Sequence, residues 1–341
     1  MLKLQLTAHG WKGEPEALVD CIIVGGGPAG LTAAIYLSRF LRRCIVIDAG
    51  AGRAATIPKT HNLPGFPGGI SGVDLLLRMK NQAQRYGATI RHGEVSLIEP
   101  SDGGGFTLRT GDDVLRAHTI LLATGVINHR PEMPSAEHDG AVARGLIRYC
   151  PVCDGYEASR MNIAVLGCDG HGAAEAEFLR TYSQQITLLP QRSTNLSPAD
   201  QARLIRAGIK VEVAAVLRLK VDRHQIVAEL VDGTTHRFDT LYPALGSSPR
   251  AQLATMIGSD LSGSGGILIN EHQQTSVPGI YAAGDVVEGL DQISVATGQA
   301  ARAATAIHNY LRDREEALAT ALGTLEADER RLLRKGTEGR P

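Results

Sequence analysis

Two cysteines three residues apart, Cys150 and Cys153, are the residues of this sequence best suited to chemistry. Thiols at this spacing can close a small disulfide and open it again. A thiolate favoured by nearby amide dipoles is a nucleophile at neutral pH. Asp154 follows directly and can serve as a general acid or base toward a sulfur atom. We therefore predict a redox-active dithiol with Cys150, Cys153 and Asp154 as its catalytic residues.

Other interpretations of these residues stay open. The pair could be half of a zinc site, although the sequence contains no second CxxC pair, and we predict no metal. It could also be a buried structural pair, and Asp154 could cap a helix. Cys21 and Cys44 lie in apolar runs and are expected in the core, whereas Cys168 is expected to be structural.

A glycine-rich loop, Gly25 to Gly30, follows the apolar run 20–24 and opens a helical pattern. In the GxGxxG pattern Gly25 permits a tight turn, Gly27 leaves space for a pyrophosphate, and Gly30 allows close packing of helix on strand. Asp48 ends the next strand, 44–48, at about the spacing of an acid that accepts ribose hydroxyls. The loop predicts a dinucleotide site; the alternative is that its glycines serve packing alone.

The same pattern begins again at residues 162–166, followed by the glycine-rich run 167–172, a helix to about Tyr182 and a strand at 186–189. Two such units predict an α/β fold with two Rossmann-like, three-layer ββα, dinucleotide-binding domains. We expect the second domain, which carries the CxxC pair, to be inserted into the first. The predicted division is 1–127 with 248–341 for the first domain and 128–247 for the second.

Further elements are expected along the chain. We predict helices at 72–87 and 292–311, and strands at 118–123 and 279–282. The stretch from about Arg312 is charged and helical in pattern, which indicates an exposed tail or a contact between subunits.

Composition limits the classes of partner. Apolar residues make up 43% of the 341 residues, enough for two domains with full cores. Lys plus Arg number 35 against 36 Asp plus Glu, so we expect no nucleic-acid partner. The sequence has no long apolar run and begins with a polar segment, so we expect no membrane partner and no secretory signal. We therefore predict a cytoplasmic protein, in which five cysteines are too few for a disulfide scaffold.

Four motifs together resemble a known family, the low-molecular-weight thioredoxin reductases among the FAD-dependent pyridine nucleotide-disulfide oxidoreductases. The motifs are GGGPAG at 25–30, NLPGFPGGISG at 62–72, CPVCDG at 150–155 and AAGDV at 282–286. The resemblance extends from about Asp20 to Tyr310. It implies non-covalent FAD, a homodimer, and an inserted pyridine-nucleotide domain that rotates. It also implies that the substrate is a thioredoxin-like protein or a small disulfide or dithiol.

The resemblance assigns roles by position. Cys153 would face the flavin and Cys150 would attack the external disulfide. Arg53 replaces a family residue and would alter the flavin surroundings, as would the run Asp291-Gln292-Ile293 where the family has Arg-Gln-Ala. The implied FAD-binding residues are Gly25, Gly27, Pro28, Ala29, Gly30, Asp48, Arg53, Asn62, Thr124, Gly125, Asp285, Gln292 and Ile293.

The second glycine-rich loop departs from the family. Asp169 stands where a glycine would admit a pyrophosphate, and Arg192 is what is left of a basic run for the NADP 2′-phosphate. The possible second-nucleotide site is reduced to Gly167, Gly170, Gly172 and Arg192. We predict poor use of NADPH, unless the loop is shifted so that Gly170 or Gly172 takes the vacated role.

The redox partner of the flavin thus stays open. A thioredoxin-reductase-like enzyme would draw on NADPH or NADH. A nicotinamide-independent relative would be a dithiol oxidase that uses oxygen, or a reductase fed by ferredoxin or a second flavin. A third hypothesis is a non-catalytic flavoprotein or a redox sensor.

Overall fold

The computed structural model describes residues 18–50 and 52–337, with side chains up to residue 320. The polar N-terminal segment that argued against a secretory signal lies outside these residues. The fold has two halves, and each is built on its own sheets. The first half combines elements from both ends of the described chain on a seven-stranded sheet in the order β3-β2-β1-β6-β5-β4, with β16 beside β6. Its strands are β1 (Val19–Val24), β2 (Cys44–Asp48), β3 (Thr89–His92), β4 (Val95–Pro100), β5 (Phe106–Thr110), β6 (Asp113–Leu122) and β16 (Ile280–Ala282).

Apolar residues on both faces of β1 and β2 explain why these strands are central and parallel. Helices α1 (Pro28–Arg39), α2 (Gly72–Arg85) and α8 (Ile293–Thr337) contribute to the core on one face. Small side chains line the contact of α1 with α8, including Ala33, Ala34, Ala300 and Ala304, so the two helices approach closely. A short helix, α7 (Gln252–Met256), packs on the opposite face.

The second half has a parallel four-stranded sheet in the order β10-β9-β8-β14. One core lies between this sheet and helices α5 and α6, and a second core lies between it and an antiparallel three-stranded sheet, which gives three layers. The elements are β8 (Asn162–Leu166), α5 (Gly170–Leu179), β9 (Gln185–Leu189), α6 (Pro198–Arg206), β10 (Lys210–Val211), β11 (Val216–Asp222), β12 (Gln225–Leu230), β13 (Thr235–Phe238) and β14 (Thr240–Pro243).

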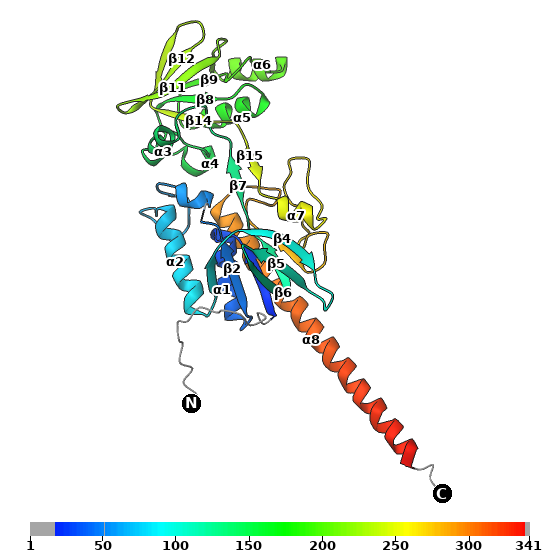
Figure 1. Ribbon diagram of the computed structural model, residues 1–341. Coiled ribbons are helices and arrows are strands. Elements are labelled where there is room, and N and C mark those ends of the chain that lie inside the picture. Colours follow the sequence, from blue (N-terminus) through cyan, green and yellow to red (C-terminus); the bar gives the residue numbers. More distant parts are fainter. Residues whose placement is uncertain (1–17, 51, 338–341) are drawn as a thin grey trace.

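Two short strands connect the halves. β7 (Val126–Asn128) leads into the second half, β15 (Ser247–Pro249) leads out of it, and the two pair antiparallel (Figure 1). The expected α/β class with two Rossmann-like units is confirmed. The division at residues 128 and 247 stays a proposal, which the pairing of β7 with β15 supports.

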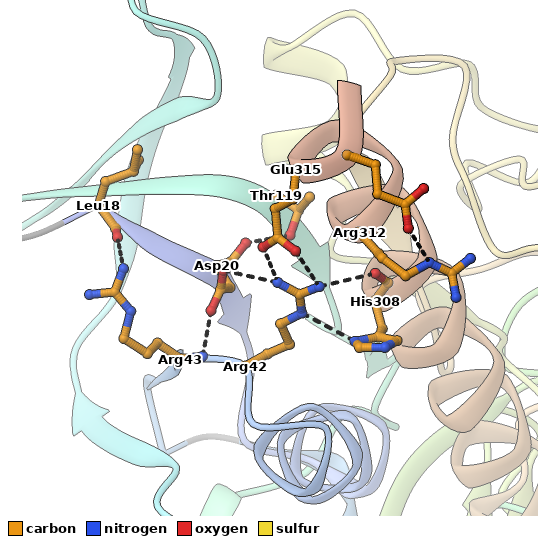
Figure 2. A network of polar contacts seen from close by, with 9 residues as sticks. Leu18, Asp20, Arg42, Arg43, Thr119, His308, Arg312 and Glu315 are labelled. Carbon is orange, nitrogen blue, oxygen red and sulfur yellow. Dashed lines mark hydrogen bonds and ion pairs between the residues drawn. The ribbon is translucent and has the colours of Figure 1, made fainter. Parts of the chain in front are cut away.

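Helix α8 runs far beyond the body of the first half, and its charged stretch after Arg312 is helical (Figure 1). Figure 2 shows the polar network that fixes the base of this extension. Arg42 donates to His308 Nδ1 at 3.1 Å and to Glu315 Oε2 at 3.2 Å, and it pairs with Asp20 at 3.8 Å. Arg42 follows α1, so the loop after α1 holds α8 in place. Among the described residues, we find no helix with the length and apolar character needed to span a bilayer.

Candidate active site

One cavity of about 780 Å³ brings together most of the predicted site. It runs along the carboxyl ends of the parallel strands of the first half, where an open α/β sheet places its ligands. The cavity is also lined by the CxxC segment of the second half. Its walls include Gly25, Gly27, Pro28, Ala29, Asp48, Arg53, Asn62, Thr124, Gly125, Cys150, Cys153, Asp154, Asp285, Gln292 and Ile293.

The first glycine-rich loop has the shape that a pyrophosphate needs. Gly25 has φ +113°, and a Cβ there would lie 2.2 Å from Ala123 O. A Cβ on Gly30 would lie 1.9 Å from Gly25 O, so this glycine lets α1 approach β1. A Cβ on Gly27 would meet nothing within 4 Å, because it would point into open space at the start of α1. The bare amides of the helix start therefore face the cavity, and the residues fit a dinucleotide such as FAD.

An arginine and two carboxylates line the same cavity. Arg53 lies in a 3-10 turn, η1 (Arg53–Thr56), and its guanidinium pairs with Asp291 at 2.9 Å and with Asp285 at 3.6 Å. Burial raises the pKa of Asp285, and Arg53 opposes that shift. The unexpected residues Arg53 and Asp291 are thus the two halves of one ion pair.

The two reactive cysteines are joined by a disulfide. Cys150 precedes a one-turn helix, α4 (Pro151–Asp154), and its sulfur accepts a hydrogen bond from the Cys153 amide at 3.1 Å. From the other half of the molecule, Gln292 Nε2 lies 3.4 Å from Cys150 Sγ and 3.2 Å from Cys153 Sγ. Both sulfurs therefore have N–H donors, which favour a thiolate when the disulfide is reduced.

Asp154 is held by two partners. Its carboxylate accepts hydrogen bonds from Arg148 at 3.0 Å and from the Tyr242 hydroxyl at 3.0 Å. Burial raises the pKa of Asp154, and the Arg148 charge opposes this shift. The carboxyl group therefore keeps its proton to higher pH than an ordinary aspartic acid, which suits a group that donates a proton near a sulfur.

Comparisons with known proteins agree with this geometry. Residues 19–300 match the family model described as pyridine nucleotide-disulphide oxidoreductase. A thioredoxin reductase of Listeria innocua is 30% identical over 89% of this chain and 97% of its own length. The NADPH-dependent thioredoxin reductase 3 of Arabidopsis thaliana is 30% identical over 87% of this chain, which spans 59% of that protein.

Solved structures give the same result. The crystal structure of HlmI has a TM-score of 0.85 at 27% identity and covers 94% of this chain and all of its own. Thioredoxin reductase from Streptococcus pyogenes has a TM-score of 0.80 at 28% identity, over 87% of this chain and 99% of its own. This chain belongs to the pyridine nucleotide-disulphide oxidoreductase family, in its thioredoxin-reductase-like branch. Membership confirms an oxidoreductase that acts on disulfides, and the family cofactor is FAD.

NADPH is the usual second cofactor of the family, and the second glycine-rich loop does not fit it. Asp169 caps α5, and its carboxylate accepts hydrogen bonds from the amides of His171 at 3.0 Å and Gly172 at 3.2 Å. A Cβ on Gly172 would lie 3.0 Å from Gly167 Cα, so Gly172 packs on Gly167 as Gly30 packs on Gly25. The loop is therefore not shifted, and Asp169 stands in the place that Gly27 takes in the first loop.

A smaller pocket of about 570 Å³ lies beside this second loop. It is lined by Asp169, by Arg192, which is the remnant of the basic run, and by His129, Arg130 and His171. The amides that would bind a pyrophosphate are occupied by the Asp169 carboxylate, which would also repel it.

The remaining cysteines do not join the site. Cys21 and Cys44 are buried, as expected, and burial raises the pKa of both thiols. Cys168 is half-buried and lies at a CxxH spacing from His171. Among the described residues, no three His, Cys, Asp or Glu side chains cluster as metal ligands would.

Two residues of the site, Arg148 and Tyr242, were not predicted from the sequence. Arg148 and Tyr242 orient Asp154, and the tyrosine comes from β14, 88 residues further on. Neither residue belongs to the CxxC pair or to a glycine-rich loop, so these motifs did not identify it. Strand β14 was not among the predicted strands, although a polar tip at the carboxyl end of a parallel strand is a general signal for a site residue.

Proposed function

We propose that this protein exchanges electrons between FAD and the Cys150–Cys153 pair, and between that pair and a thioredoxin-like protein or a small disulfide or dithiol substrate. The observation that supports this most is the shared cavity: the glycine-rich loop and the disulfide line the same space. FAD, when bound, supplies two-electron chemistry at that site.

The residues of the chain then have distinct roles. Gly25, Gly27 and Gly30 would hold the pyrophosphate on the start of α1, and Asp48 would accept the ribose hydroxyls. Pro28, Ala29, Thr124 and Gly125 would line the nucleotide, and Asp285 the ribityl region. Arg53, Asn62, Gln292 and Ile293 would surround the ring system.

In the dithiol, Cys150 would attack the external disulfide and Cys153 would exchange electrons with the flavin. Attack by the Cys150 thiolate on a substrate disulfide forms a mixed disulfide and releases one substrate thiolate. Cys153 then attacks Cys150, re-forms the internal disulfide and releases the second substrate thiolate. Asp154 would take the proton of Cys150 as that sulfur attacks and pass it to the first departing thiolate, and the second substrate sulfur leaves as a thiolate.

The purified protein is expected to be yellow, with about one FAD per chain, because the first loop meets each steric requirement of a dinucleotide site. Denaturation followed by chromatography measures the flavin. Under argon, the pre-reduced protein should pass electrons to an oxidised thioredoxin-like protein or a small disulfide. Release of FMN, or a well-folded sample without flavin, would contradict the assignment.

A second candidate function is favoured by one specific observation, the Asp169 cap. A nicotinamide-independent enzyme on the same scaffold would run the thiol exchange in reverse or take electrons from another carrier. As a dithiol oxidase it would oxidise a substrate dithiol to a disulfide and reduce oxygen to hydrogen peroxide. Turnover of a dithiol with oxygen and without NADPH distinguishes this candidate from a reductase.

We also propose a cytoplasmic homodimer, on the basis of the family resemblance. A reducing compartment keeps such a dithiol available for turnover rather than as a fixed structural bridge.

A further inference from the structure

Three side chains form a hydrogen-bond chain that ends at the reactive sulfurs. Thr60 Oγ1 donates to Asn62 Oδ1 at 2.9 Å, and Asn62 Nδ2 donates to Gln292 Oε1 at 3.0 Å. Gln292 Nε2 then donates to Cys153 Sγ at 3.2 Å and to Cys150 Sγ at 3.4 Å. Each group in the chain donates in the same direction, toward the sulfurs.

These hydrogen bonds fix which end of the Gln292 amide faces the disulfide. An amide could present either its oxygen or its nitrogen to a sulfur, and the surrounding hydrogen bonds decide between them. The Gln292 oxygen accepts from Asn62 Nδ2, and that amide group is oriented by the Val152 carbonyl at 3.5 Å, which can only accept. The Asn62 oxygen accepts from the buried Thr60. The N–H group is therefore left for the sulfurs, and donors polarised in series strengthen one another.

We propose that Gln292 is a catalytic residue that stabilises the Cys153 thiolate, with Asn62 and Thr60 as positioning residues. This inference rests on the proposed function. Two electrons and one proton convert the disulfide into one thiol and one thiolate, and the electrons come from the flavin or from a substrate dithiol. A disulfide sulfur is a weak acceptor and a thiolate is a strong one, so the Gln292 donor favours the reduced pair.

The same contact joins the two halves of the molecule. Gln292 immediately precedes α8 of the first half, whereas the cysteines belong to the second half. Asn62 Nδ2 also lies 3.5 Å from Val152 O, between the two cysteines. The amide pair therefore contacts the CxxC segment at its backbone and at both sulfurs, and holds it against the cavity.

The test compares Gln292→Met, which keeps the length but loses the donor, with the wild-type holoprotein. Both are equilibrated under argon in glutathione buffers, quenched with acid and alkylated, and the thiols of the pair are counted by mass spectrometry. The expected result is that the disulfide of the variant is about tenfold harder to reduce, equivalent to about 30 mV. Asn62→Ala should shift the equilibrium in the same direction by less. The exposed residue Gln201 of α6, which donates to Leu196 O in the preceding loop, gives the matched control Gln201→Met, for which no change is expected.

A spectroscopic measurement accompanies the equilibrium. In a Cys150→Ser background, adding Gln292→Met is expected to weaken the long-wavelength absorption of the Cys153 thiolate beside oxidised flavin at pH 7. If Gln292→Met loses FAD, the Asn62→Ala holoprotein is used instead, with the same glutathione equilibrium and the same absorption band as the two measurements. An equilibrium within twofold of wild type and an undiminished band would overturn the role of Gln292. A wild-type protein whose dithiol exchanges no electrons with the flavin would overturn the proposed function instead.

Discussion

Replacing Cys150 by serine is expected to abolish turnover and to produce a long-wavelength absorption band. Without its partner, Cys153 cannot form the disulfide and remains a thiolate that lines the flavin cavity with Gln292 as its donor. A thiolate next to oxidised flavin gives a charge-transfer band. Loss of the nucleophile should lower the rate with any disulfide by about 10⁴-fold or more.

The matched variant is Cys153→Ser. It is expected to keep a flavin that can still be reduced but that passes no electrons to a substrate, and to show no such band. Absorption spectra of the two purified variants, with the rate of substrate reduction for each, make the comparison. A band in the Cys153 variant and none in the Cys150 variant would show that the two roles are reversed.

Wild-type protein is expected to bind NADPH weakly, and Asp169→Gly should tighten binding by about 10- to 100-fold. The carboxylate occupies the amides of His171 and Gly172, and adds a negative charge where a diphosphate would lie. A hydrogen bond to a charged group is worth about 1.5–3 kcal/mol, and about 1.4 kcal/mol is tenfold in affinity. Glycine is itself an acceptable N-cap, so the variant should lose only a few tenths of a kcal/mol of stability.

Calorimetric titration with NADPH measures this effect without any turnover. The converse change, Gly27→Asp, places the same carboxylate at the start of α1, where a Cβ has free space. That variant should fold and lose FAD. If micromolar NADPH bleached the wild-type flavin saturably in the absence of oxygen, the claim that Asp169 prevents NADPH binding would be contradicted. The protein would then use NADPH as an ordinary thioredoxin reductase does.

The parts of the fold that the sequence predicted are those fixed by local rules. The two GxGxxG-type loops were predictable because backbone clashes at Gly25 and Gly30 forbid a side chain. The apolar runs of β1, β2 and β8 were predictable because strands buried on both faces read as continuous apolar segments. The antiparallel strands β4, β5 and β11 to β13 escaped prediction, because their mixed polar and apolar residues resemble loops.

The candidate site was predicted as a set of motifs but not as a set of contacts. The ion pair between Arg53 and Asp291 spans 238 residues, and each partner alone looked like an unexplained substitution. Gln292 was assigned to the ring system by resemblance, and its hydrogen bonds to the two sulfurs were not predicted. Such contacts depend on how the two halves meet, and no local periodicity records that arrangement.

The most direct test is an anaerobic titration of the purified protein with dithionite, following flavin absorbance. If the flavin and the Cys150–Cys153 disulfide share electrons, complete bleaching should consume about four electron equivalents per FAD, two for each group. The variant that lacks both cysteines should consume about half as many. Bleaching of the wild-type flavin by two equivalents, with the disulfide still intact, would contradict electron exchange between the flavin and the dithiol.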